Sequence, residues 1–198
     1  MLEHTPSKVG FMRHVHRVVI IVALIGPVTI SVACAEQEKS VNSGALNASI
    51  RKLAPGAAVV VTQEVDAISC NPVGDNPGLV RADFNGDGRP DYAALLKIRE
   101  TGKKTIWEGK TLREASFSFV LFLDDGHGGY EPRVVRRYTD FIPTGVVLDL
   151  QPPGSVLNGE TQKSITLSNP GVTLSFCEKS AVTYYVAGGK IHSIPIAD

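Results

Sequence analysis

The chain has few of the residues that enzymes and nucleic-acid-binding proteins rely on. It holds five histidines, three cysteines and one tryptophan among 198 residues, and 20 acidic side chains balance its 20 basic ones. Recognition of nucleic acid needs a concentrated positive surface. The balanced charge therefore predicts that the protein does not bind nucleic acid.

Short catalytic motifs are also missing. The sequence has no Gly-x-Ser-x-Gly elbow, no glycine-rich phosphate loop ending in lysine and no His-Glu-x-x-His helix. Only His127 and His192 follow the N-terminal leader, one in a glycine-rich turn and one among apolar neighbours, and both are expected to be structural. We therefore predict no catalytic activity.

One enzymatic alternative stays open, a carbohydrate-active hydrolase of the cell envelope that uses paired carboxylates. The candidate pair is Asp124, Asp125 or Asp140 together with Glu178. Such an enzyme needs a cleft with two facing carboxyl groups about 5 to 10 Å apart. A binding module would have no such cleft.

Long apolar runs are absent except near the N-terminus, where the sequence predicts a signal peptide over residues 1–35. Arg13 and Arg17 precede a nearly uncharged run, and Ala33-Cys34-Ala35 offers the small residues that signal peptidase recognises. We expect cleavage after Ala35, whether translation starts at Met1 or at Met12. The mature protein is then periplasmic or secreted.

Two other fates of the leader are open. Cys34 would carry a lipid anchor in a lipoprotein, although Ser31 stands where that signal prefers an aliphatic residue. An uncleaved membrane anchor needs about 20 apolar residues, and the run here has about sixteen. The sequence thus predicts no transmembrane segment in the mature chain.

Cleavage leaves two cysteines, Cys70 and Cys177. In an oxidising compartment an even pair of cysteines usually forms a disulfide. We expect a bond between them, and two separate buried thiols are the alternative.

The remaining 163 residues are enough for one domain with a core. We predict a linker over 36–43 and a single β-rich domain over 44–198. A helix should begin after Asn42 or Ser43, bury one stripe of Leu46, Ile50 and Leu53, and end at Pro55-Gly56.

The rest of the chain predicts strands and tight turns. The fold class is mainly β: antiparallel sheets arranged as a β-sandwich or like a propeller blade, with one short N-terminal helix. Turns are expected at 124–129, at 169–171 and at Gly188-Gly189. The expected strands are 57–65, 92–98, 116–123, 130–138, 146–150, 165–168, 172–176, 183–187 and 190–196.

One segment has the ligand pattern of a calcium loop. Oxygen-bearing side chains stand at positions 1, 3, 5 and 9 from Asp83 to Asp91, with glycine at position 6. Calcium takes about six to eight oxygen ligands, and a loop supplies them from alternate positions only if its backbone curls tightly. Gly86 and Gly88 permit that curl. The predicted ligands of Ca²⁺ are Asp83, Asn85, Asp87, the Arg89 carbonyl and Asp91.

Two features separate this loop from an EF-hand. Position 12 is Ala94, so the bidentate glutamate is absent, and a strand is expected next instead of a helix. Arg89 stands at position 7, where any residue type is tolerated because the main-chain carbonyl is the ligand. A solvated acidic turn is the alternative interpretation.

Residues 82–92 resemble the FG-GAP or VCBS repeat, the unit of calcium loop and strands in integrin-type β-propeller blades. The following hairpin, with Phe117–Leu123 and Gly128-Gly129-Tyr130, is similar to the rest of such a blade, so the resemblance covers about residues 80–135. Propellers have about four to eight blades, and this chain shows one copy. The resemblance implies calcium binding without an activity.

The chain is also similar to small secreted bacterial proteins of uncharacterised function that combine a helix, one such loop and a C-terminal strand. Glu178, Lys179, Tyr184 and Tyr185 fit that strand. Adjacent tyrosines point to opposite faces, so we expect one in the core and the other exposed. We predict an exported calcium-binding structural or binding module whose partner is an envelope or extracellular protein or a glycan.

Overall fold

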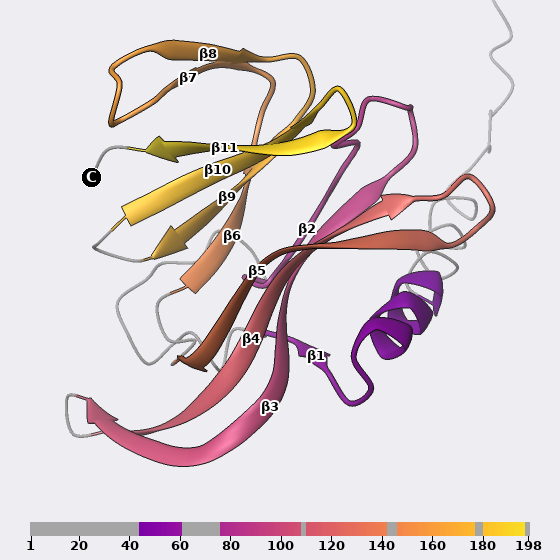
Figure 1. Cartoon of the computed structure of the whole chain (residues 1–198). Helices are drawn as coiled ribbons and strands as arrows, with labels where there is room; N and C mark the ends of the chain where they lie inside the picture. The colour runs from indigo at the N-terminus through magenta and orange to yellow at the C-terminus, as the bar shows by residue number, and fades with distance from the viewer. Residues whose placement is uncertain (1–43, 61–75, 108–109, 142–145, 177–179, 197–198) are drawn as a thin grey trace, which may run out of the picture.

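The computed structural model describes residues 44–60, 76–107, 110–141, 146–176 and 180–196. Within these ranges the protein is mainly β, with antiparallel sheets and a single short helix, as the sequence predicts (Figure 1). Two sheets pack face to face as a sandwich, and the helix covers the outer face of one of them. No helix in these ranges is long and apolar enough to span a bilayer.

The first sheet is built around one long hairpin. Its strands are β1 (Ala58–Val59), β2 (Leu79–Ala82), β3 (Asp91–Trp107), β4 (Lys110–Asp124) and β5 (Tyr130–Phe141). β3 pairs with β4 and β4 with β5, while β1 and β2 share the other side of β3. The loop that carries the predicted calcium ligands connects β2 to β3.

The second sheet has the order β11-β10-β9-β6. Its strands are β6 (Val146–Gln151), β9 (Gly171–Phe176), β10 (Ser180–Ala187) and β11 (Lys190–Ile196). The predicted turn at Gly188-Gly189 is confirmed, and both glycines have positive φ, 56° and 72°. Such angles suit a two-residue hairpin turn.

A separate hairpin lies beside the second sheet. It consists of β7 (Gly154–Leu157) and β8 (Ser164–Leu167), drawn in orange in Figure 1. The sequence does not predict β7, and the strands on either side of the 169–171 turn do not pair with each other. Pro170 lacks the N–H that a ladder needs, and Leu167 instead packs into a small cluster with Val156 and Ile194.

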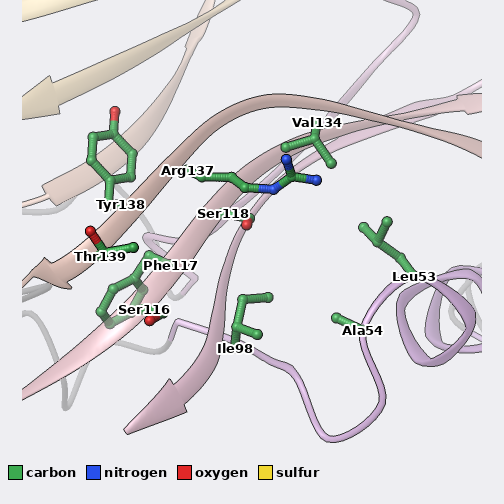
Figure 2. Close-up of a pocket in the computed structure, with 10 residues that line it drawn as sticks. All are labelled: Leu53, Ala54, Ile98, Ser116, Phe117, Ser118, Val134, Arg137, Tyr138 and Thr139. Carbon is green, nitrogen blue, oxygen red and sulfur yellow. The ribbon is translucent and has the colours of Figure 1, made fainter. Parts of the chain in front are cut away.

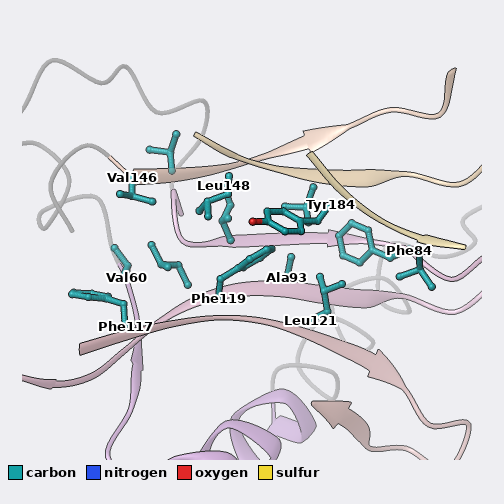
Figure 3. Close-up of a cluster of buried hydrophobic side chains, with 14 of the residues drawn as sticks. Val60, Phe84, Ala93, Phe117, Phe119, Leu121, Val146, Leu148 and Tyr184 are labelled. Atoms are coloured by element: carbon teal, nitrogen blue, oxygen red, sulfur yellow. The ribbon is translucent and has the colours of Figure 1, made fainter. Parts of the chain in front are cut away.

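The main core lies between the two sheets (Figure 3). Phe117, Phe119 and Leu121 alternate along β4 and face the second sheet, where Leu174 and Tyr184 meet them. Residues 117–123 of β4 are buried on both faces of the sheet, and there the sequence is a nearly continuous apolar run.

The helix covers the other face of the first sheet. It spans residues 44–53 and packs against Val120 and Phe122. Leu46 and Ile50 are buried and Leu53 is half-buried, which confirms the predicted apolar stripe. The residues expected to cap the helix lie outside the described ranges.

Several strands differ in length from the prediction. β3 and β4 continue far beyond 92–98 and 116–123 as a two-stranded arm, visible at the bottom of Figure 1. Arm side chains are mostly exposed, and Ile106 is 76% exposed. Only Ala58–Val59 of the expected strand over 57–65 is β1, and residues 61–65, like the predicted disulfide partners Cys70 and Cys177, lie outside the described ranges.

Candidate functional site

The candidate site is the loop from Asp83 to Asp91, at one end of the sandwich. Its second residue, Phe84, is 1% exposed and inserts into the core between the sheets (Figure 3). The ligand pattern gives Phe84 no role, although a large apolar side chain inside an otherwise polar loop is the signal for an anchor. This anchor fixes the start of the loop on the core.

Asp83 organises the backbone of the loop. Its Oδ1 accepts hydrogen bonds from the N–H groups of Gly86 and Asp87 at 2.7 and 3.1 Å, and its Oδ2 accepts one from Gly88 at 2.8 Å. Gly86 and Gly88 have φ values of 78° and 82°. Glycine adopts this left-handed region without strain, so the loop has the tight curl that the ligand pattern requires.

Asn85 and Asp87 contact each other within this curl. The Asn85 amide donates to Asp87 Oδ2 at 2.9 Å, and the Asp87 backbone N–H donates to Asn85 Oδ1 at 3.0 Å. Burial works to raise the pKa of Asp87, but hydrogen bonds from Arg89 and Asn85 and the charge of Arg89 together lower it. A carboxylate that stays ionised is what a cation site needs.

The Arg89 side chain forms ion pairs, although position 7 of a calcium loop accepts any residue type. Its guanidinium lies 2.7 Å from Asp87 Oδ2 and 2.7 Å from Asp124 Oδ1. Asp124 ends β4, so Arg89 links the calcium-type loop to the turn between β4 and β5. An exposed pair contributes little stability, and its role here is to join two turns.

Asp91 has a different environment from the other predicted ligands. It is fully buried; Oδ2 accepts the N–H groups of Phe84 and Asn85 at 2.9 and 3.3 Å, and Oδ1 accepts the Asp124 N–H at 2.8 Å. Burial raises the pKa of Asp91, although these three bonds work to lower it. A carboxylate accepts about four hydrogen bonds, so Asp91 already uses most of its capacity to hold the loop.

The donor set matches a hard cation in chemistry. Asp83, Asn85, Asp87 and the Arg89 carbonyl all offer oxygen, which calcium prefers. Within the described part of the chain, no three His, Cys, Asp or Glu side chains gather closely enough to hold a metal alone. A calcium ion in this loop therefore depends on the Asn85 amide and on the main-chain carbonyl as well.

Asp124 and Asp125, two candidate carboxylates of the hydrolase alternative, accept backbone hydrogen bonds in the turn between β4 and β5. Asp125 Oδ1 accepts the N–H groups of His127 and Gly129 at 2.8 and 3.0 Å, and these bonds lower the pKa of Asp125. Asp124 pairs with Arg89. The side chain of Asp140 and all of Glu178 lie outside what the structure describes.

Among the residues that the structure describes, no carboxylate lines the pockets beside the helix, beside the calcium-type loop or between β5 and the β10–β11 hairpin. The one in Figure 2 has a volume of about 240 Å³ and lies beside the helix, between Leu53, Ile98 and Val134. Arg137 is the only charged side chain in its lining. These pockets thus offer no acid and base pair.

Of the two adjacent tyrosines, one is in the core as predicted, but the other is not fully exposed. Tyr184 is buried against Phe119, with ring centroids 5.1 Å apart. Tyr185 is half-buried rather than exposed, because the β7–β8 hairpin packs near it and its ring stacks on His192 at 5.2 Å.

Comparisons with protein-family models, with curated proteins and with solved structures find no match. Function is therefore inferred from the loop and its surroundings.

Proposed function

We propose that this protein is an exported calcium-binding module with a structural or binding role. The observation that carries the proposal is the curl of the loop: one carboxylate, on Asp83, gathers the amides of Gly86, Asp87 and Gly88. Loop positions 1, 3 and 5 then lie around a single turn of backbone, which is the arrangement that lets alternate oxygens converge on an ion.

Calcium at this loop would strengthen a junction between three segments. Phe84 fixes the loop to the core, Asp91 accepts the amide of Asp124, and Arg89 pairs with the same residue. A divalent ion also neutralises carboxylates that otherwise repel each other. The role we infer is to hold β2, β3 and the β4–β5 turn together at this end of the sandwich.

The affinity should be weak. Position 12 is Ala94, which is buried inside β3 and supplies no carboxylate. Without a bidentate glutamate we expect a dissociation constant of about 0.1 to 1 mM, the range of extracellular modules. Such a site fills outside the cell, which agrees with the export predicted from the leader; the intact mass of the secreted product tests that export.

The decisive experiment is thermal unfolding of the purified protein with calcium and with chelator. Binding only to the folded state adds about 2.7 kcal/mol when calcium is a hundredfold above its dissociation constant. Asp87→Ala should remove most of this gain. Asp125→Ala is the matched control, because it deletes an aspartate from a neighbouring exposed turn. A wild-type midpoint that millimolar calcium leaves unmoved would show that the loop is only an acidic turn.

A further inference from the structure

A pocket of about 290 Å³ lies directly beside the calcium-type loop. Three segments far apart in sequence form it: Asn85 of the loop; Thr166, Ser168 and Asn169 at the end of β8 and just after it; and residues 185–189, at the end of β10 and in the turn that follows. The loop touches the second segment closely, since a Cβ on Gly86 would lie 2.5 Å from the Asn169 amide. The pocket therefore exists only in the folded sandwich.

Most polar side chains of this pocket are uncommitted, although that of Asn85 bonds Asp87 within the loop. Across the part of the chain that the structure describes, the side chains of Thr166, Ser168, Asn169 and Tyr185 make no hydrogen bond. A neighbouring pocket of about 310 Å³ differs, because there Arg136 donates to the Tyr184 hydroxyl at 3.4 Å and His192 bonds the Ala187 carbonyl. Thr166 and Ser168 are exposed and Asn169 and Tyr185 are half-buried, so all four can offer hydrogen bonds to a ligand in the first pocket.

The pocket selects for a neutral ligand. No charged side chain lines it, so a charged group that entered would lose hydration without a counter-charge. Anions are also disfavoured by the carboxylates of Asp83 and Asp87 in the adjoining loop. The ligand must instead offer several uncharged hydrogen-bonding groups.

One wall of the pocket is aromatic. The Tyr185 ring stacks on His192 with an interplanar angle of 26°, and this contact sets its orientation. Aromatic rings pack well against C–H groups and carry a polar tip. Saccharides combine an apolar C–H face with a rim of hydroxyl groups, which matches this wall and the amide and hydroxyls beside it.

We propose that the pocket binds a neutral saccharide unit of a glycan. Thr166, Ser168 and Asn169 hydrogen-bond its hydroxyl groups, and Tyr185 packs against its C–H face. The volume is near the lower limit of about 300 Å³ for ligand pockets, so one or two sugar units fit. The proposal goes beyond calcium binding, because these four side chains do not include a predicted metal ligand.

The test is an NMR titration of the ¹⁵N-labelled protein with cellobiose, maltose and N,N′-diacetylchitobiose, in calcium and in chelator. We expect saturable shifts of the amide signals of residues 166–169 and 185–189 and of the Asn169 side-chain amide. Asn169→Asp keeps the shape and adds a charge, and it should weaken binding about fivefold or more, the effect of one hydrogen bond. Tyr185→Leu, which removes the ring that packs against the sugar, should also weaken binding, whereas Tyr185→Phe keeps the ring and should change it little. Asn47→Asp makes the same change as Asn169→Asp on an exposed helical residue and should have no effect.

The outcomes separate this proposal from calcium binding. Shifts that appear in chelator, in a protein whose melting ignores calcium, would support the pocket and overturn only the metal site. No shift with any of the three sugars, or shifts that Asn169→Asp leaves unchanged, would overturn the pocket even if calcium raises the melting midpoint. Shifts caused by a triserine peptide and by none of the sugars would point to a protein partner and equally overturn it.

Discussion

Two aspartates of the same loop act in different ways. Asp83 is half-buried and curls the backbone, whereas Asp91 is fully buried and ties the loop to the end of β4. Sequence spacing predicts both aspartates as metal ligands, because the spacing indicates only which loop positions carry an oxygen-bearing side chain. Burial depends on how β3 and β4 pack, which no local pattern records.

Asp91→Ala should destabilise the protein strongly in chelator. The change removes three hydrogen bonds to a carboxylate and leaves the amides of Phe84 and Asp124 without an acceptor, a loss of at least about 3 kcal/mol. Urea unfolding measures it. Asp91→Asn keeps one acceptor oxygen, so its free energy of unfolding should fall by less. Asp125→Ala, on the exposed turn, should lower the free energy of unfolding far less. If Asp91→Ala and Asp125→Ala lost similar amounts, the tie would not stabilise the fold.

Gly86 and Gly88 form a second matched pair. Both have positive φ, but a Cβ at Gly88 meets no atom within 4 Å, while one at Gly86 would collide with Asn169. Gly88→Ala should lower the free energy of unfolding by about 1 to 2 kcal/mol, because alanine is strained in the left-handed backbone conformation. Gly86→Ala should lower the free energy of unfolding by about 1 kcal/mol more than Gly88→Ala, since Asn169 must move to make room for the new methyl group.

Urea unfolding of the two variants, alone and combined with Asn169→Ala, separates the two effects. The excess loss of Gly86→Ala should disappear when Asn169 is shortened. Equal losses for the two glycine variants in the parent protein would mean that the contact with Asn169 does not constrain the loop.

At the scale of elements, alternation and turn residues predict most strands. The helix stripe, the β10–β11 hairpin and the core strands β3 to β6 appear where periodicity and glycine turns place them. The prediction fails where pairing is a choice between partners. The sequence of residues 165–176 does not indicate that β8 pairs with the preceding strand, β7, instead of with β9. This pairing depends on the burial of Val156 and Leu167 against Ile194.

The arm of β3 and β4 is the other element that the sequence does not predict. Between Lys97 and Ala115 none of the hairpin side chains that the structure describes is buried, and the ladder is interrupted between Glu100 and Lys104. Polar contacts such as Arg113 to Glu100 at 3.1 Å support it. The arm residues are mostly charged or polar and do not alternate with apolar ones, so the sequence pattern does not predict that the strands continue there.

Hydrogen exchange should divide this hairpin into two parts. Amides of residues 104–106 and 111–113 should exchange at least about a hundredfold faster than those of residues 93–96 and 119–122, because local opening of the arm exposes no core. Arg113→Ala should change the arm little, since exposed ion pairs contribute about 0 to 1 kcal/mol. Uniform protection along the hairpin would contradict the division.

At the scale of the whole molecule, the two sheets share one core. Residues of both sheets interlock in the main cluster, and the Leu148 N–H also donates to the Pro77 carbonyl at 2.7 Å. The resemblance to a propeller blade covers only the first sheet, and the sequence left a sandwich and a blade equally open. The sandwich follows from the inward apolar side chains of β6, β9 and β10, which cover a face that a lone blade would leave exposed.

A pair of aromatic rings joins the two sheets. Phe119 of β4 and Tyr184 of β10 meet edge to face at 5.1 Å in the centre of the core. Aromatic pairs of this kind add about 0.5 to 1.5 kcal/mol beyond their buried area. Phe119→Leu and Tyr184→Leu keep both sites apolar, so urea unfolding of the two single variants and the double variant gives the coupling energy. We expect a coupling within that range and one cooperative transition in every variant, because neither sheet has a core of its own on this face. Strictly additive losses would show that the two rings are not coupled, and two separate transitions would show that the sheets unfold independently.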